Sequence, residues 1–69
     1  MAEIGQLCKI KLDQDTIYKI IDVRTKKHNI ITDEAQTIIQ NTFVDVVEVE
    51  DSNVTKLNIS IFDIHIIED

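Results

Sequence analysis

The stretch N-I-I-T-D-E-A-Q-T-I-I-Q, residues 29–40, decides how the rest of the chain can fold. It is nearly palindromic, so a four-residue loop D-E-A-Q would place Ile30 opposite Ile39 and Ile31 opposite Ile38. Pairs of β-branched residues that face each other across two strands stabilise a sheet. Facing residues also share a side of the sheet, so we expect an apolar pair on each face of the hairpin. Both faces then need cover, from the protein's own sheet or from another chain.

A short helix over residues 33–41 is the alternative for the same stretch. Asp33 could cap its N-terminus together with Gln36 three positions later. Three β-branched residues in a row, Thr37 to Ile39, lose rotamer freedom in a helix. The hairpin is therefore the preferred interpretation, and the helix stays open as the second one.

The composition predicts a mainly β protein that forms one domain over residues 1–69. The chain has 14 isoleucines, six valines and six threonines but no proline and one glycine. Such β-branched side chains pack well on a pleated surface. The single cysteine cannot form an internal disulfide, so a chain this short needs either a well-packed aliphatic core or self-association to be stable.

Alternation of apolar and polar residues divides the chain into strands and turns. Besides the hairpin, strands are expected at 7–12, 16–24, 43–50 and 55–67, and turns at 13–15, 25–28 and 51–53. The apolar positions change face within 43–50 and again within 55–67, which indicates bulges or sharp bends in these strands. The pattern as a whole predicts a small, strongly bent antiparallel barrel of five to six strands.

In strand lengths and order, residues 7–67 resemble the Src-homology-3-like barrel, which is also found in small phage and ribosome-associated proteins. The resemblance implies a small binding module, of the kind that phages encode as accessory proteins or as inhibitors of host proteins. The aromatic groove that binds proline-rich ligands is missing, because Tyr18, Phe43 and Phe62 are the three aromatic residues.

Thirteen acidic and seven basic residues give a net charge of -6. This balance argues against general nucleic-acid binding and against anionic membrane surfaces, both of which need basic residues. No apolar run approaches the roughly 18 residues that span a bilayer. The start M-A-E-I-G-Q lacks the features of a signal peptide, so we expect a cytoplasmic protein, in the host cytoplasm if the source is viral.

Three groups of side chains are candidate sites. Asp63 and His65 share a strand face, as metal ligands or an oriented base would, but the solvent side of a strand is the simpler interpretation. Cys8 alternates with apolar residues and is expected in the core. A basic cluster at the predicted turn could bind a phosphate or an acidic partner: Arg24, Lys26, Lys27 and His28.

No nucleophile–base pair, phosphate loop or zinc signature is present, so the sequence predicts no enzyme, no cofactor and no metal. The first hypothesis is an acidic protein-binding module with a basic protein partner, whose carboxylates could also imitate DNA phosphates. The predicted contact residues are Ile30, Ile39, Asp45, Glu48, Glu50, Asp51 and Phe62. A homo-oligomer that buries its isoleucine faces is one alternative. A nucleic-acid-binding barrel that uses Lys19 and residues 24–28 is the other.

Overall fold

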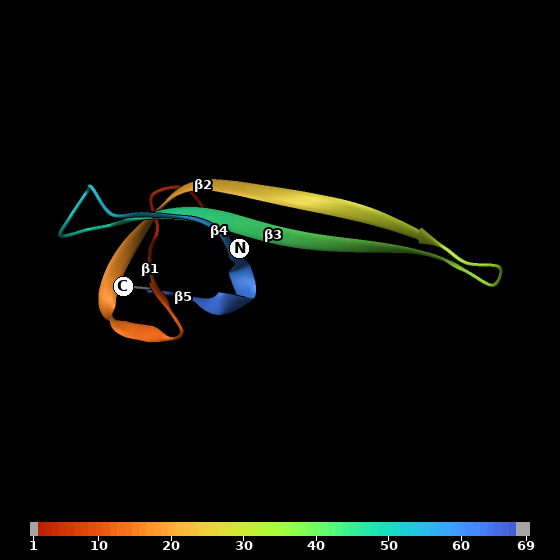
Figure 1. Cartoon of the computed structure of the whole chain (residues 1–69), viewed down its shortest axis with the longest axis horizontal. Helices are drawn as coiled ribbons and strands as arrows, with labels where there is room; N and C mark the ends of the chain where they lie inside the picture. Colours follow the sequence, from red (N-terminus) through yellow and green to blue (C-terminus); the bar gives the residue numbers. More distant parts are fainter. Residues whose placement is uncertain (1, 68–69) are drawn as a thin grey trace.

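The protein is described here from a computed structural model, which covers residues 2–67 (Figure 1). Its five strands are β1 (Leu7–Ile10), β2 (Asp13–Ile31), β3 (Gln36–Glu48), β4 (Thr55–Ser60) and β5 (Ile64–Ile66), and a 3-10 turn, η1 (Ile61–Asp63), precedes β5. They form one antiparallel sheet in the order β4-β3-β2-β1-β5. The predicted mainly β class is confirmed, and the sheet has five strands where five to six were predicted. Residues 2–67 contain no α-helix, and thus no helix that could cross a membrane.

The molecule consists of a small body and a long two-stranded arm (Figure 1). We call residues 24–43 the arm; it comprises the second part of β2, the first part of β3 and the loop between them. At about 3.4 Å per residue, the eight residues from 24 to 31 span about 27 Å. That is about half of the long axis of the molecule, whose extents are 51 × 21 × 20 Å. The arm therefore projects well beyond the body.

The arm confirms the predicted hairpin and excludes the helix at 33–41. Its register differs by two residues from the expected one, because Ile30 pairs with Thr37 and Ile31 with Gln36. The predicted faces still hold, since a shift of two keeps every residue on its side of the sheet. Ile30 and Ile39 thus share one face diagonally. The turn predicted at 25–28 is wrong, because these residues continue β2 and pair with β3.

The tip of the arm sets this register. The Thr32 N–H donates to the Ala35 carbonyl at 2.9 Å, and the Thr32 hydroxyl accepts from the Ala35 N–H at 3.1 Å. Asp33 and Glu34 are left at the apex, and neither has a positive φ. Two-residue loops of the favoured hairpin types need a positive φ, which Gly or Asn would supply. The hydrogen bonds of the Thr32 hydroxyl close the loop without that geometry. The loop therefore spans residues 32–35 and not residues 33–36.

The core lies within the body and is small. Its buried side chains are Ala2, Cys8, Tyr18, Ile20, Val44, Val46 and Ile64. Cys8 is fully buried, as the alternation of the first strand predicted. The Tyr18 hydroxyl reaches the carboxylate of Asp13 at 3.3 Å, so the one buried tyrosine keeps a hydrogen bond. This core stabilises the body, while the arm contributes no buried side chain between residues 25 and 40.

The predicted closure into a barrel is wrong. β4 pairs with β3, and β5 pairs with β1, so β4 and β5 are the two edges of an open sheet. The sheet is strongly bent all the same, because the three residues of η1 carry the chain from one edge to the other. A pocket lies at the opening, lined by Ile10, Lys11, Leu12, Lys56, Ile59 and Asp63.

The changes of face in the sequence have other causes than expected. β3 is regular: Val44 and Val46 are buried, whereas Val49 after its end is 52% exposed. The extra residues of the bulges lie in its neighbours. One is Ile21 in β2, between the pairs of Ile20 and Asp22, and β4 has its own opposite the same part of β3. The bulge at Ile21 lets both Ile20 and Val23 face the core.

The predicted long strand over 55–67 is interrupted by η1 at the point where the pattern changes face. The Ser60 hydroxyl accepts a hydrogen bond of 3.3 Å from the Phe62 N–H and so begins the turn. Ile64 behind the turn is buried, whereas Phe62 on the turn is 73% exposed. β4 and β5 are thus two short strands on opposite edges of the sheet.

Because the core is small, we expect Ile20→Ala to lower the free energy of unfolding by about 2–5 kcal/mol, the usual cost of this truncation at a buried site. Ile31→Ala in the arm, where the side chain is 77% exposed, should change it by less than about 0.5 kcal/mol. Urea unfolding followed by circular dichroism measures both. If Ile20→Ala does not fold, Ile20→Val should still cost about 0.5–1.5 kcal/mol. Equal effects at both sites would contradict the division into core and arm.

Candidate functional site

The arm exposes two apolar stripes, one on each face. Ile31 and Ile38 lie on the face that continues from the core residues Val23 and Val44. Their side chains are 77% and 59% exposed. No element among residues 2–67 covers this face of the arm, so the isoleucines are exposed to solvent.

The opposite face carries two isoleucines and a phenylalanine. Ile30 and Ile39 are 45% and 40% exposed and lie diagonally across the two strands. His28 pairs with Ile39, and Phe43 lies on the same face near the body. The Lys26 ammonium lies 5.8 Å from the centre of the Phe43 ring, where the ring attracts a cation. We call this set, Lys26, His28, Ile30, Ile39 and Phe43, the outer arm face.

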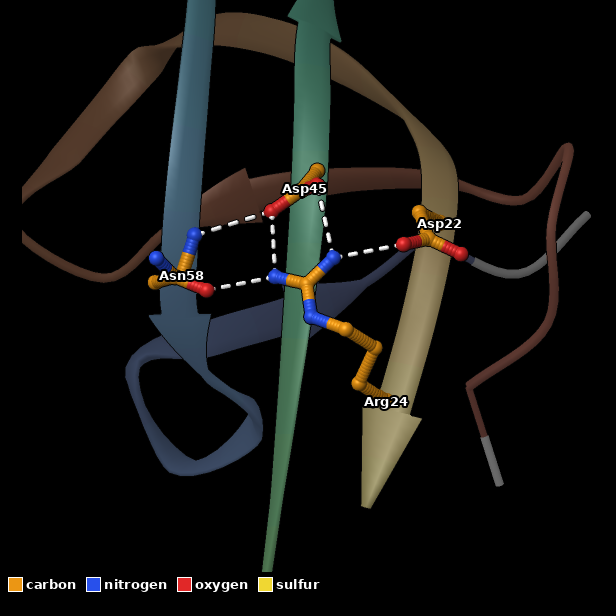
Figure 2. Close-up of polar contacts among 4 residues, drawn as sticks. All are labelled: Asp22, Arg24, Asp45 and Asn58. Atoms are coloured by element: carbon orange, nitrogen blue, oxygen red, sulfur yellow. Dashed lines mark hydrogen bonds and ion pairs between the residues drawn. The ribbon is translucent and has the colours of Figure 1, made fainter. Parts of the chain in front are cut away.

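An ion pair lies where the arm meets the body (Figure 2). Both guanidinium Nη atoms of Arg24 donate to the Asp45 carboxylate, at 2.8 Å each. Arg24 also donates to Asp22 on its own strand and to the Asn58 side chain on β4. The Asn58 N–H donates to Asp45 at 2.9 Å. One arginine therefore links three neighbouring strands.

The geometry of this cluster depends on the bulges. At Asp45 the pairing register of β3 shifts against both neighbouring strands, against β2 at Ile21 and against β4 next to Asn58. Asn58 has a φ of 56°, a left-handed conformation that asparagine adopts more readily than most residues. This conformation lets both its N–H and its side chain point at the Asp45–Arg24 pair.

The cluster fixes the charge of its members. Hydrogen bonds from Arg24 and from the Asn58 N–H lower the pKa of Asp45 from 3.8 to about 2. The bonds to Asp45 and Asp22 raise the pKa of Arg24 further above its usual range. Asp45 is thus a structural carboxylate that is already paired, and it is not available to a basic partner.

The predicted contact residues do not form one site. Ile30 and Ile39 lie together on the arm, while Asp45 belongs to the ion cluster. Glu48 is half-buried at the end of β3, and Glu50 and Asp51 are exposed in the turn at the end of the body opposite the arm tip (Figure 1). Phe62 lies on η1. The acidic residues among the predicted contacts are therefore divided between the ion cluster and the end of β3 with the turn that follows it.

The other candidate groups are also separated. Arg24 is paired, and alternation places Lys26 and Lys27 on opposite faces of the arm, so the predicted basic cluster is divided between two surfaces. Asp63 and His65 are both exposed, one on η1 and one on β5. Among residues 2–67 no group of three potential ligands could hold a metal ion. Burial raises the pKa of the Cys8 thiol, which makes it a poorer nucleophile.

Sequence analysis missed Asn58 and the role of Asp22. The signal available for Asn58 was an asparagine inside an alternating strand, where residues with low β-propensity often mark an irregularity. Nothing in the sequence indicated which strand would face it. The ion cluster needed the order of β2, β3 and β4 before its members could be brought together.

The lowered pKa of Asp45 predicts a loss of stability in acid. Between pH of about 4 and about 2 the unfolded state binds a proton at this residue that the folded state does not, so stability falls as the pH falls. Asp45→Asn removes this contribution. Its deficit in unfolding free energy relative to the wild type should therefore be largest above pH of about 5 and should shrink towards pH of about 2.

Urea unfolding at a series of pH values measures this deficit. Glu50→Gln, at an exposed carboxylate in the distal turn, is the matched control and should keep the wild-type pH dependence. A deficit of Asp45→Asn that stays constant over the whole acid range would contradict the assigned role of the carboxylate.

No family model, curated protein or solved structure matches this chain. The arm and the ion cluster at its base are therefore the features from which a function can be proposed.

Proposed function

We propose that this protein is a non-enzymatic protein-binding module whose contact element is the arm. The observation that carries the proposal is the arm's lack of cover: side chains from Thr25 to Gln40 are exposed, with isoleucines on both faces. A two-stranded hairpin without packing is marginally stable in water. A partner that covers the arm would supply the packing that the body does not.

The outer arm face is the better contact surface of the two. Besides Ile30 and Ile39 it carries the half-buried Phe43 near the body, whereas the core-side face carries Thr25 and Thr42 at the same level of the arm. Full burial of a fully exposed isoleucine contributes roughly 1.5–3 kcal/mol, and Ile30 and Ile39, at 45% and 40% exposure, can contribute about half of that each. Two such side chains therefore suffice for a specific contact of moderate affinity.

The ion cluster supports this role by fixing the base of the arm. Arg24 holds β2, β3 and β4 together at the point where the two-stranded segment leaves the sheet. A fixed base lowers the entropy that is lost when the arm binds. The geometry thus favours an arm that is oriented before a partner arrives.

The net charge supports a basic partner. A charge of -6 steers oppositely charged proteins over distances of about a Debye length. The exposed carboxylates of Glu50 and Asp51 lie away from the arm, so the charge acts on the approach of the partner and the arm forms the contact. The role of a small accessory protein or inhibitor, which the resemblance to Src-homology-3-like proteins implies, is part of this proposal.

The test is retention of protein partners by the immobilised chain, followed by affinity measurement with the purified partner. Ile30→Ser/Ile39→Ser should raise the dissociation constant by about 10-fold or more, because each isoleucine loses about half of the roughly 1.5–3 kcal/mol that full burial contributes. Serine leaves the net charge unchanged. Circular dichroism and urea unfolding should show that the body of this variant is as stable as the wild type.

Leu12→Ser is the matched control, since Leu12 is fully exposed on the body and lies outside the arm. It should bind as the wild type does. Unchanged affinity of the Ile30→Ser/Ile39→Ser variant would show that the arm is not the contact element.

A further inference from the structure

The pocket at the opening of the sheet belongs neither to the arm nor to the ion cluster. Its walls come from β1, the turn after β1, β4 and η1: Ile10, Lys11, Leu12, Lys56, Ile59 and Asp63. Ile10 and Ile59 also pack against the core, so they form the side of the pocket that faces it. The volume of about 530 Å³ lies in the usual range of small-molecule sites, about 300–1,000 Å³. An apolar group bound in the pocket would therefore extend the core.

Hydrogen bonds hold the walls of the pocket in place. The Lys11 N–H donates to the Asp63 carbonyl at 2.9 Å, which joins the turn after β1 to η1. The side-chain amide of Gln14 donates to the carbonyls of Ile10 and Lys11, at 3.3 and 3.1 Å, and so fixes the turn itself. The pocket is thus formed before a ligand binds, which lowers the entropy lost on binding.

The pocket carries a net positive charge on an acidic protein. Two of the seven basic residues of the chain, Lys11 and Lys56, line it together with one carboxylate, that of Asp63. The ion pairs among residues 2–67 all involve Arg24, so neither lysine lies at ion-pair distance from a carboxylate in this part of the chain. The Lys56 ammonium lies 5.9 Å from the centre of the Tyr18 ring.

One further carboxylate is near enough to interact with Lys56. The charge of Lys56 contributes to the lowered pKa of Asp13, after stronger effects that begin with a hydrogen bond from Thr16. Asp13 does not line the pocket, and its carboxylate already accepts hydrogen bonds from the Tyr18 hydroxyl and the Asp15 N–H. The lining itself therefore keeps an excess of one positive charge.

The strand edges beside the pocket disfavour an added strand as its occupant. The register of β4 with β3 is shifted between the pairs of Val44 and Val46, and Asn58 in β4 has a φ of 56°. β4 also carries Lys56, and β5 has three residues. Bulges, lysines and short edge strands all discourage pairing with another strand. A ligand of this pocket is therefore bound through apolar burial and charge.

We propose that the pocket binds a small amphiphilic carboxylic acid. Its apolar chain lies against Ile10, Leu12 and Ile59, and its carboxylate lies at the ammonium groups of Lys11 and Lys56. Leu12 is fully exposed in the free protein, so the apolar chain removes a large apolar side chain from water. One carboxylate balances the excess charge of the lining. The proposal does not depend on the proposed function, because the arm takes no part in it.

The test is a titration of the full chain with decanoate below its micelle-forming concentration, followed by the NMR shifts of the backbone amides and by calorimetry. We expect saturable shifts that are confined to residues 10–12, 56–59 and 63. Decyltrimethylammonium has the same apolar chain and the opposite charge. It should bind at these residues at least about 5-fold more weakly, because it loses the attraction of two lysines and is repelled by them.

Two variants separate the charged from the apolar contacts. Lys11→Gln/Lys56→Gln should weaken decanoate binding by about 2- to 30-fold, the effect of two exposed ion pairs, and should leave the binding of uncharged decanol unchanged. Leu12→Ser should weaken the binding of both probes by about 3-fold or more. All three positions are exposed, so circular dichroism should show an unchanged fold.

Lys26→Gln/Lys27→Gln on the arm is the matched control for charge. It removes the same two charges away from the pocket and should bind decanoate as the wild type does. Ile30→Ser/Ile39→Ser should also bind decanoate normally, so failure of this proposal and failure of the proposed function are distinguishable.

Absence of saturable shifts at residues 10–12, 56–59 and 63 up to millimolar decanoate would overturn the proposal. Equal affinity for decanoate and decyltrimethylammonium at these residues would overturn it too, as would an equal loss in the control variant on the arm. Loss of a retained protein partner by Leu12→Ser, without any binding of decanoate, would assign the pocket to a protein contact instead.

Discussion

The ion pair between Arg24 and Asp45 is the interaction on which the rest of the structure depends. β3 runs straight through both parts of the molecule, and its two neighbours adjust to it with one extra residue each, opposite Asp45. The bulge at Ile21 turns β2 so that Ile20 and Val23 both reach the core while Arg24 faces outward. The same shift brings the guanidinium over the carboxylate. The packing of the core, the two bulges and the ion pair therefore depend on one another.

On one side of this junction the chain forms a compact core, and on the other the same two strands form a hairpin without one. The seven buried residues of the core all belong to the body. A chain of 69 residues would bury more if it folded both strands back on themselves. This chain extends about half of its long axis into solvent instead. The fold of the single chain does not bury the isoleucines of the arm. We propose that they make intermolecular contacts.

Sequence patterns predicted what burial determines and missed what other strands determine. The alternation around Ile30 and Ile39 indicated the correct faces, and Cys8 was correctly placed in the core. The register of the arm was missed because it depends on one hydroxyl, that of Thr32, whose contribution is comparable to that of the isoleucine pairs. Residues 25–28 were predicted as a turn because apolar and polar residues do not alternate in a strand that is exposed on both faces. Whether the sheet is open or closed, and which residues contact Asp45, depends on the order of the strands. The alternation of apolar and polar residues does not indicate that order.

The pairing of β1 with β5 has a consequence for the order of folding. It joins residues 7–10 to residues 64–66, so nearly the whole chain must close into a loop before this ladder can form. The arm needs only contacts between residues near each other in the sequence, and hairpins of this kind form within microseconds. Contacts of high sequence separation slow folding. Closure of the body is thus the slow step, and until it happens the arm with its exposed isoleucines is present on a chain whose core is still unformed.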